Sequence, residues 1–350
     1  MDQIEREQGG VPVLRDTKYS LYQMYKEMLT SYLDTKNEQA LYHAQQFSKE
    51  MMEKDMSPEE TVSLHLSVFQ ELATELPEEV VDSFDLLLEV MVGYGLAYRE
   101  HQSLRDRQRE LDSELNVASR MQQSLLPHQE IGLDAIDLGV VSVPAGKMSG
   151  DYYHYMTDER DNVAIAVADV IGKGIPAAMS MSMIKYAMDT LTEQSLRPRS
   201  ILEKLNRVVE RNIESDMFIT MMYGFYDTNI HRFSMASAGH EPGFLYRAES
   251  DSFEDLEAKG LVLGVSPKVS YEEIIYDIQV GDFIVLLSDG VTECRIDGEF
   301  IRRDQVMDMI RKRKDLEAQE IVDSIYYELE RAQGFQLRDD FTLLILKRKV

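Results

Sequence analysis

Residues 164–174 read Ala-Ile-Ala-Val-Ala-Asp-Val-Ile-Gly-Lys-Gly, an apolar run of strand length that ends in an aspartate and a glycine-containing turn. This pattern predicts a buried β-strand with Asp169 at its end. The same arrangement returns at 284–290, where Ile-Val-Leu-Leu-Ser is followed by Asp289 and a glycine. Two strands that are far apart in the sequence are therefore expected to end in carboxylates.

Further aspartates lie beside other strand patterns. Asp151 follows Ser-Gly and precedes two tyrosines, and the doublet Asp339-Asp340 precedes an apolar run. Carboxylates that converge without partners raise one another's pKa, so such a cluster needs compensation. Divalent cations such as Mg²⁺ or Mn²⁺ supply it, because hard ions take carboxylate, carbonyl and water oxygens as ligands. A lone turn aspartate usually only caps its own backbone, but the four sites together favour a metal centre.

The number of acidic positions suits two cations rather than one. Two ions roughly 3.5–4 Å apart can share a hydroxide and direct it at a phosphorus or carbonyl centre. The residues alone therefore indicate a metal-assisted hydrolase, most simply of a phosphoester. Leu287 stands where a haloacid-dehalogenase phosphatase needs its nucleophilic aspartate, which excludes the aspartyl-phosphate mechanism.

Residues 126–350, which contain these motifs, mix strand and helix patterns without a regular βαβ rhythm. This indicates an α+β C-terminal domain with layered sheets rather than a doubly wound parallel sheet. Residues 1–86 carry only helical patterns, which predict an all-α N-terminal bundle. Within it, Ser57-Pro58-Glu59-Glu60 combines an N-cap serine, a first-turn proline and a capping-box glutamate.

A heptad pattern runs through residues 87–125 and predicts a coiled-coil linker helix that ends at Pro127. Its seam includes Leu104, Leu111, Leu115 and Leu125. The seam also contains His101, Gln108 and Gln122, which pack poorly between helices, so we expect it to be marginal and switchable. A single solvated connecting helix is the alternative.

Composition excludes several classes of protein. The formal charge of −26 argues against a chain that mainly binds nucleic acid or an anionic membrane. The single cysteine excludes a disulfide framework and a cysteine-based zinc site. The first residues lack the basic and apolar regions of a signal peptide, and no apolar run has membrane-spanning length. We therefore expect a cytoplasmic protein.

Six motifs, in this order and at these intervals, resemble the metal-dependent serine/threonine protein phosphatases of the PPM family. They lie at 118–127 (Ala-x-x-x-Gln-x-x-Leu-Leu-Pro), 149–153 (Ser-Gly-Asp-Tyr-Tyr), 168–177 (Ala-Asp-Val-Ile-Gly-Lys-Gly-Ile-Pro-Ala), 237–240 (Ser-Ala-Gly-His), 288–292 (Ser-Asp-Gly-Val-Thr) and 339–342 (Asp-Asp-Phe-Thr). The resemblance covers roughly residues 118–348 and is closest to the bacterial sporulation and stress-response branch.

This resemblance implies two stacked antiparallel sheets flanked by helices, with two Mn²⁺ or Mg²⁺ ions at one rim. Asp169 would bridge both ions and so position the nucleophilic hydroxide, and the backbone carbonyl of Val170 would bind one of them. Asp151 matches an acidic position near the second metal. Asp289 and Asp339 match ligands of the first, and Asp340 is the alternative to Asp339.

The sequence departs from the family pattern in two places. Many relatives outside this branch carry a histidine, their proposed general acid, in the turn after Asp169, and it is absent here, which leaves the proton donor open. No residue matches the phosphate-binding arginine of those relatives, so Lys173, Arg120 and Lys147 are only candidates. We interpret His240 as a structural, hydrogen-bonding turn residue.

The resemblance also implies a substrate and partners. It predicts a phosphatase that hydrolyses phosphoserine on an anti-sigma-factor antagonist in the general stress response, by hydroxide attack on phosphorus without a covalent intermediate. Residues 1–86 would be a regulatory and dimerisation domain. A switch-kinase-like activator would bind this domain in a homodimer, order the linker and move the helix 176–191. The alternatives are a non-catalytic signalling scaffold on the same fold and a metal-dependent phosphatase with another substrate.

Overall fold

The computed structural model describes residues 13–54, 56–73, 75–127, 131–171, 174–192, 197–213, 217–296, 299–335 and 337–350. Lys173 and Gly172 lie outside these ranges. The chain divides into two compact units, residues 1–110 and 111–350. Among the described residues, no helix combines the length and the apolarity that crossing a bilayer requires.

The helices and strands have the following bounds. The helices are α1 (Val13–Thr35), α2 (Glu38–Glu53), α3 (Pro58–Leu72), α4 (Glu78–Gln123), α5 (Ile175–Thr192), α6 (Pro198–Asn212), α7 (Asp289–Thr292), α8 (Arg303–Arg311) and α9 (Ala318–Ala332). The strands are β1 (Ile136–Val143), β2 (Asp151–Thr157), β3 (Val163–Val170), β4 (Ile219–Asp227), β5 (Arg232–Ala238), β6 (Gly243–Arg247), β7 (Ser252–Leu256), β8 (Ile274–Asp277), β9 (Phe283–Leu287), β10 (Arg295–Ile296), β11 (Glu299–Phe300) and β12 (Phe341–Arg348).

The first unit is helical, and the predicted start of α3 is confirmed. The Ser57 hydroxyl accepts a bond from the Glu60 backbone N–H at 3.3 Å, and the Glu60 carboxylate accepts one from the Ser57 N–H at 3.1 Å. Two N–H groups that the helix leaves unpaired are thereby satisfied. The small core of this unit centres on Leu21, Phe47 and Met51.

Helix α4 contains the predicted linker and is a single helix of 46 residues. Two of its seam residues are largely solvent-exposed, Leu104 at 62% and Leu111 at 52%, whereas Leu115 and Leu125 are half-buried. The helix ends at Gln123 and is followed by hydrogen-bonded turns, so the expected stop at Pro127 was slightly late.

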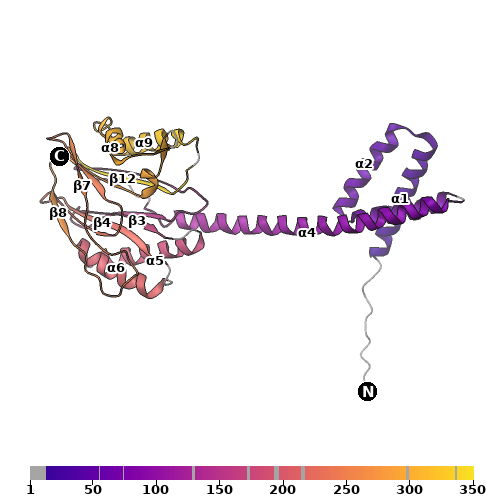
Figure 1. Ribbon diagram of the computed structural model, residues 1–350, viewed down its shortest axis with the longest axis horizontal. Coiled ribbons are helices and arrows are strands. Elements are labelled where there is room, and N and C mark those ends of the chain that lie inside the picture. The colour runs from indigo at the N-terminus through magenta and orange to yellow at the C-terminus, as the bar shows by residue number, and fades with distance from the viewer. Residues whose placement is uncertain are drawn as a thin grey trace, which may run out of the picture. The chain divides into compact units, whose positions relative to one another are not determined.

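The second unit is the predicted pair of stacked antiparallel sheets. One sheet has the strand order β1-β12-β9-β6-β7, and the other has the order β2-β3-β4-β5-β8. Helices α8 and α9 cover the first sheet and α5 and α6 cover the second, which gives four layers (Figure 1). Helices α8 and α9 follow each other closely and are joined by the turns at 312–315.

Side chains on β3 show how the layers pack. Val163, Ile165 and Val167 face the other sheet, and the alanines between them face α5 and α6. The small alanine side chains let the helices approach the sheet closely, while the β-branched residues fill the space between the sheets. β3 is therefore almost completely buried, and Asp169 is carried at the end of a rigid strand.

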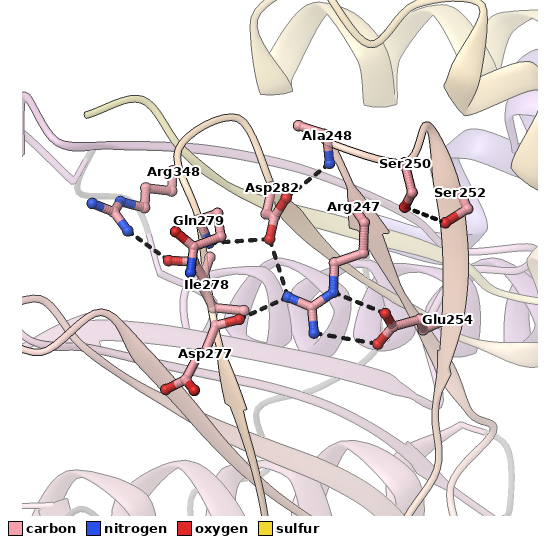
Figure 2. Close-up of polar contacts among 10 residues, drawn as sticks. All are labelled: Arg247, Ala248, Ser250, Ser252, Glu254, Asp277, Ile278, Gln279, Asp282 and Arg348. Carbon is pink, nitrogen blue, oxygen red and sulfur yellow. Dashed lines mark hydrogen bonds and ion pairs between the residues drawn. The ribbon is translucent and has the colours of Figure 1, made fainter.

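A buried ion pair closes one end of the sandwich (Figure 2). The Asp282 carboxylate accepts bonds from the backbone N–H groups of Ala248 at 2.8 Å and Gln279 at 3.0 Å and from the Arg247 guanidinium at 3.1 Å. Arg247 also donates to both oxygens of Glu254, at 3.0 and 3.3 Å. Asp282 is nearly inaccessible, with a side chain 2% exposed. We call this group the Asp282 clasp.

Candidate metal centre

The predicted acidic residues come together at the end of the sandwich opposite the Asp282 clasp. Asp151 begins β2 and lies directly opposite Asp169 on β3 in the antiparallel register. Asp289 begins α7, which follows β9, and the doublet Asp339-Asp340 precedes β12, the neighbour of β9. Strand order alone therefore gathers residues that are up to 189 positions apart, from Asp151 to Asp340.

The electrostatics of the site confirm that the carboxylates lie close together. Burial raises the pKa of Asp151 well above its ordinary value, the Ser288 and Thr342 hydroxyls oppose this, and the charges of Asp169 and Asp340 add to it. Burial likewise raises the pKa of Asp289, with a further contribution from Asp339 and Asp340. The structure thus brings together every aspartate that the sequence singled out.

Asp151 is the most deeply buried of these carboxylates. It is 2% exposed, and its Oδ2 atom has no hydrogen-bond partner among the described residues. An unpaired buried carboxylate oxygen is costly unless a positive charge neutralises it. This atom is one observation in favour of a cation.

Gly150 supplies a second observation. A Cβ atom at this position would lie 3.2 Å from Asp169 Oδ1, 3.2 Å from the carbonyl oxygen of Val170 and 3.6 Å from Asp340 Oδ2. Three oxygens therefore surround a point that the glycine leaves free of a side chain. Carboxylate and carbonyl oxygens are the donors that Mg²⁺ and Mn²⁺ take.

The two members of the doublet have different surroundings. Asp340 accepts hydrogen bonds from the backbone N–H of Ala145 at 2.7 Å and of Gly150 at 2.5 Å, so both of its oxygens hold the loop 144–150. Asp339 Oδ1 accepts the N–H of Asp340 at 3.0 Å and no other hydrogen bond from the residues that the structure describes. The carboxylate of Asp339 is thus less committed to backbone groups.

Within the described residues, no three His, Cys, Asp or Glu side chains form a ready-made metal-binding group. Like charges repel when nothing positive lies between them, so the side chains need to close on a cation to ligate it. The orphaned oxygen of Asp151 and the open space beside Gly150 fit such a closure, and the donor set is that of a hard ion.

The phosphate-binding candidates are less well placed. Lys147 forms an ion pair with Asp112 of α4 at 2.7 Å, and Arg120 is an exposed residue of α4. Lys173 lies outside the described residues, as noted above. Within the described residues, neither Lys147 nor Arg120 is thereby identified as a phosphate ligand.

His240 has a structural environment. It is buried, its Nε2 lies 3.1 Å from the carbonyl oxygen of Leu287 and its Nδ1 lies 2.9 Å from the Thr220 hydroxyl. A carbonyl only accepts, so Nε2 carries the proton and Nδ1 accepts from Thr220. Burial lowers the pKa of His240 to about 4, so the ring is neutral near pH 7.

Sequence reasoning did not single out two polar residues near Asp151. The side chains of Ser288 and Thr342 favour the ionised form of the Asp151 carboxyl and so oppose the rise of its pKa, and the Ser288 hydroxyl accepts the Thr342 N–H at 3.0 Å. Both residues stand inside motifs already recognised, at 288–292 and 339–342. Their common target emerges only when β9 and β12 pair.

Comparisons with known proteins agree with this geometry. The family model described as Stage II sporulation protein E matches residues 159–349, and that of the N-terminal domain of phosphoserine phosphatase RsbU matches residues 23–97. Phosphoserine phosphatase RsbU of Bacillus subtilis is 50% identical over 335 residues, which cover 96% of this chain and 100% of that protein.

Solved structures share the fold at lower identity. The SiaA-PP2C domain of Pseudomonas aeruginosa is 21% identical with a TM-score of 0.61, and the match covers 69% of this chain and 98% of that one. The RsbU and RsbW domains of Rv1364c from Mycobacterium tuberculosis are 23% identical with a TM-score of 0.54, covering 61% of this chain and 60% of that one.

Proposed function

The chain belongs to the family of RsbU phosphoserine phosphatases, and on this premise we propose that it is a metal-dependent phosphatase of phosphoserine in a partner protein. The observation that carries the proposal is the convergence of five aspartates at one end of the sandwich, of which Asp151 is buried and Asp289 exposed, with raised pKa values on both. Such a cluster is stable only around positive charge, which suits hydrolysis of a phosphate ester.

The site residues have distinct proposed roles. Asp169 and the Val170 carbonyl, beside the space at Gly150, would hold two divalent cations, Mn²⁺ or Mg²⁺, together with Asp151 and Asp289. When bound, such cations activate water as a nucleophile and neutralise charge on the phosphoryl oxygens.

The remaining ligand is Asp339 rather than Asp340. Asp340 is committed to the N–H groups of the loop 144–150 and positions that loop instead. The side chains of Ser288 and Thr342 favour the ionised form of Asp151, which is the form that binds a cation.

The substrate and partners follow from the family. We propose that the substrate is a phosphorylated anti-sigma-factor antagonist of the RsbV kind in the general stress response, and that residues 1–86 receive a switch-kinase-like activator. The match of residues 23–97 to the N-terminal domain of RsbU supports this. The exposure of Leu104 and Leu111 supports a homodimer whose linker helices, within 87–125, pair as a coiled coil. Partner binding would order that linker and shift α5.

Two alternatives are less well supported. In a non-catalytic scaffold, burial of the Asp151 carboxylate would destabilise the fold without serving any function. A phosphatase of small phosphomonoesters would not need a separate helical unit of about one hundred residues.

Release of inorganic phosphate from a phosphorylated anti-sigma-factor antagonist tests the proposal. The full chain is assayed with Mn²⁺, with EDTA and with the activator, next to Asp169→Asn. We expect Mn²⁺-dependent turnover that Asp169→Asn lowers at least about 100-fold. Absence of turnover even with the activator would support the scaffold, whereas equal turnover of 4-nitrophenyl phosphate and the phosphoprotein would support the small-molecule alternative.

A further inference from the structure

His240 hydrogen-bonds both sheets at the end of the sandwich that carries the metal centre. It lies in the segment 239–242, which connects β5 of one sheet to β6 of the other. Gly239 turns the chain there with a φ of 69°, a conformation that glycine adopts without strain. The Ser237 hydroxyl accepts the His240 N–H at 3.2 Å. The backbone therefore fixes the point from which the imidazole ring extends.

In the sheet that contains β3 and β4, the ring bonds to the row of residues that includes two proposed ligands. The antiparallel register places Asp151 opposite Asp169, and Asp169 opposite Thr220. Directly paired residues point to the same face of a sheet, and here it is the face of Val167, between the two sheets. The Thr220 hydroxyl lies 2.9 Å from Nδ1 of His240 and donates to it.

In the other sheet, the ring bonds to the end of β9. Its Nε2 donates to the carbonyl oxygen of Leu287 at 3.1 Å. Leu287 is the last residue of β9 and precedes Asp289 by two positions. The side chain of Thr220, the ring of His240 and the carbonyl of Leu287 thus form a continuous connection, which we call the His240 bridge. It joins the strand ends that carry Asp169 and Asp289.

The bridge matters because these two aspartates come from different sheets. Their separation depends on the distance between the sheets, whereas metal–ligand distances are held within about 0.2 Å. Apolar side chains such as Val167 and Leu286 fill the space between the sheets, but their attraction is non-directional and specifies no exact spacing. Two hydrogen bonds on opposite sides of a rigid ring do specify it.

We propose that His240 is a positioning residue of the metal site, whose ring sets the spacing between the Asp169 and Asp289 ends of the two sheets and thereby tightens cation binding. The inference rests on the proposed function, because it takes these two aspartates as ligands. The ring is 9% exposed and both of its nitrogens have protein partners, so it acts through Thr220 and Leu287. A site whose ligands reach the right spacing only part of the time binds more weakly in proportion to that fraction.

The hydroxyl of Thr220 allows the bridge to be cut without replacing the ring. Valine has nearly the shape of threonine but cannot donate to Nδ1, whereas serine keeps the hydroxyl. Thr228 offers a matched control, because it lies just beyond the opposite end of β4 and is half-buried like Thr220. Its hydroxyl also makes a side-chain hydrogen bond, to Oδ1 of Asn162 at 3.3 Å.

Direct Mn²⁺ binding to the full chain tests the proposal, with free Mn²⁺ measured by electron paramagnetic resonance during titration of metal-depleted protein. For Thr220→Val we expect a dissociation constant about fivefold higher, and for Thr220→Ser one within twofold of the unmodified protein. Thr228→Val should also bind within twofold. Both valine variants should lower the melting temperature in EDTA to a similar extent, since each loses one hydrogen bond.

A double variant shows whether Thr220 acts through the ring. His240→Leu removes both bonds of the bridge and should raise the dissociation constant by about tenfold or more. In that background, adding Thr220→Val should change Mn²⁺ affinity by less than twofold, because the bond that it removes is already lost. The Thr220 and Thr228 variants decide the question even if His240→Leu does not fold.

The outcomes separate this inference from the proposed function. Equal Mn²⁺ affinity in Thr220→Val and Thr228→Val would overturn it, because the bridge would then only stabilise the fold. A fivefold effect of Thr220→Val that persists in the His240→Leu background would also overturn it, since Thr220 would act on the cation directly. Either result leaves phosphate release by the unmodified protein intact. If the unmodified protein neither binds Mn²⁺ nor releases phosphate, the proposed function fails and the inference with it.

Discussion

Gly290, the glycine that follows Asp289, cannot carry a side chain without disturbing the metal centre. A Cβ atom there would lie 2.8 Å from the carbonyl carbon of Asp340 and closer still to its carbonyl oxygen, whereas ordinary contact begins near 3.4 Å. The neighbour is backbone, which cannot rotate away as a side-chain tip can. In Gly290→Ala the start of α7 or the segment 339–340 must shift.

The size of the effect follows from the bonds around this contact. The Ser288 hydroxyl donates to the Asp340 carbonyl at 3.2 Å and accepts the Thr342 N–H at 3.0 Å, so a shift of the doublet also displaces Ser288, which influences the pKa of Asp151. Relief of the clash requires a displacement of roughly 1 Å, and a misplacement of that size can lower turnover about 100-fold. The cost in stability is smaller, about 1–3 kcal/mol, because the contact lies at the edge of the core.

The assay is release of phosphate from the phosphorylated antagonist at saturating Mn²⁺, accompanied by thermal unfolding in EDTA. Gly146→Ala is the control, because it lies on the loop 144–150 and no heavy atom lies within 4 Å of its Cβ position. We expect Gly146→Ala to retain activity within about twofold and Gly290→Ala to lose about 100-fold. A Gly290→Ala enzyme within threefold of normal activity would refute the view that this contact sets the site geometry.

Three further measurements examine charge and burial. In EDTA, Asp151→Asn should melt about 2–4 °C higher than the unmodified protein, because the cost of burying the carboxylate, about 1 kcal/mol, is relieved. The same variant should lose the rise in Tm that Mn²⁺ induces. A retained rise would contradict the assignment of Asp151 as a ligand. Asp282→Asn should cost about 3 kcal/mol of unfolding free energy, since it removes the buried partner of Arg247 and leaves that guanidinium only its half-exposed partner Glu254, while Mn²⁺ affinity measured by titration stays within twofold. Burial lowers the pKa of His154 to about 4, so below pH 6.5 the unfolded chain binds a proton that the folded chain does not, and stability falls. Between pH 7 and pH 5, the free energy of unfolding measured with urea in EDTA should therefore fall by about 2 kcal/mol less in His154→Phe than in the unmodified protein. Substitution of the exposed His43 by Phe is the control and should not reproduce this difference.

Strand-ending aspartates could be predicted from the sequence because their signal is local. An apolar run followed by Asp169 or Asp289 shows both the strand and its end within ten residues. The expectation that these ends converge came from the number of acidic sites and from the family resemblance, which implied two cations at one rim. The capping box at Ser57 was predictable for the same reason, since all its partners lie within one helical turn.

Contacts between distant strands could not be predicted in this way. The bonds of Asp340 to Ala145 and Gly150 join positions about 190 residues apart, and nothing in either local sequence specifies the other. Gln122 carried a misleading signal, because its position in the heptad predicts a poor seam residue, whereas its amide is buried against Ser149. Tertiary pairing, not propensity, decides the role of such residues.

The Asp282 clasp has a consequence for how such a domain can diversify. β9 runs from the clasp at one end to Asp289 at the other, so the strand is anchored by an internally neutralised charge where no chemistry takes place. Mutations at the catalytic rim therefore act on turns whose supporting strands are fixed independently of them. Substitutions at that rim can therefore change substrate preference with little loss of folding stability. Selection on regulation and selection on stability then act on opposite ends of the same strands.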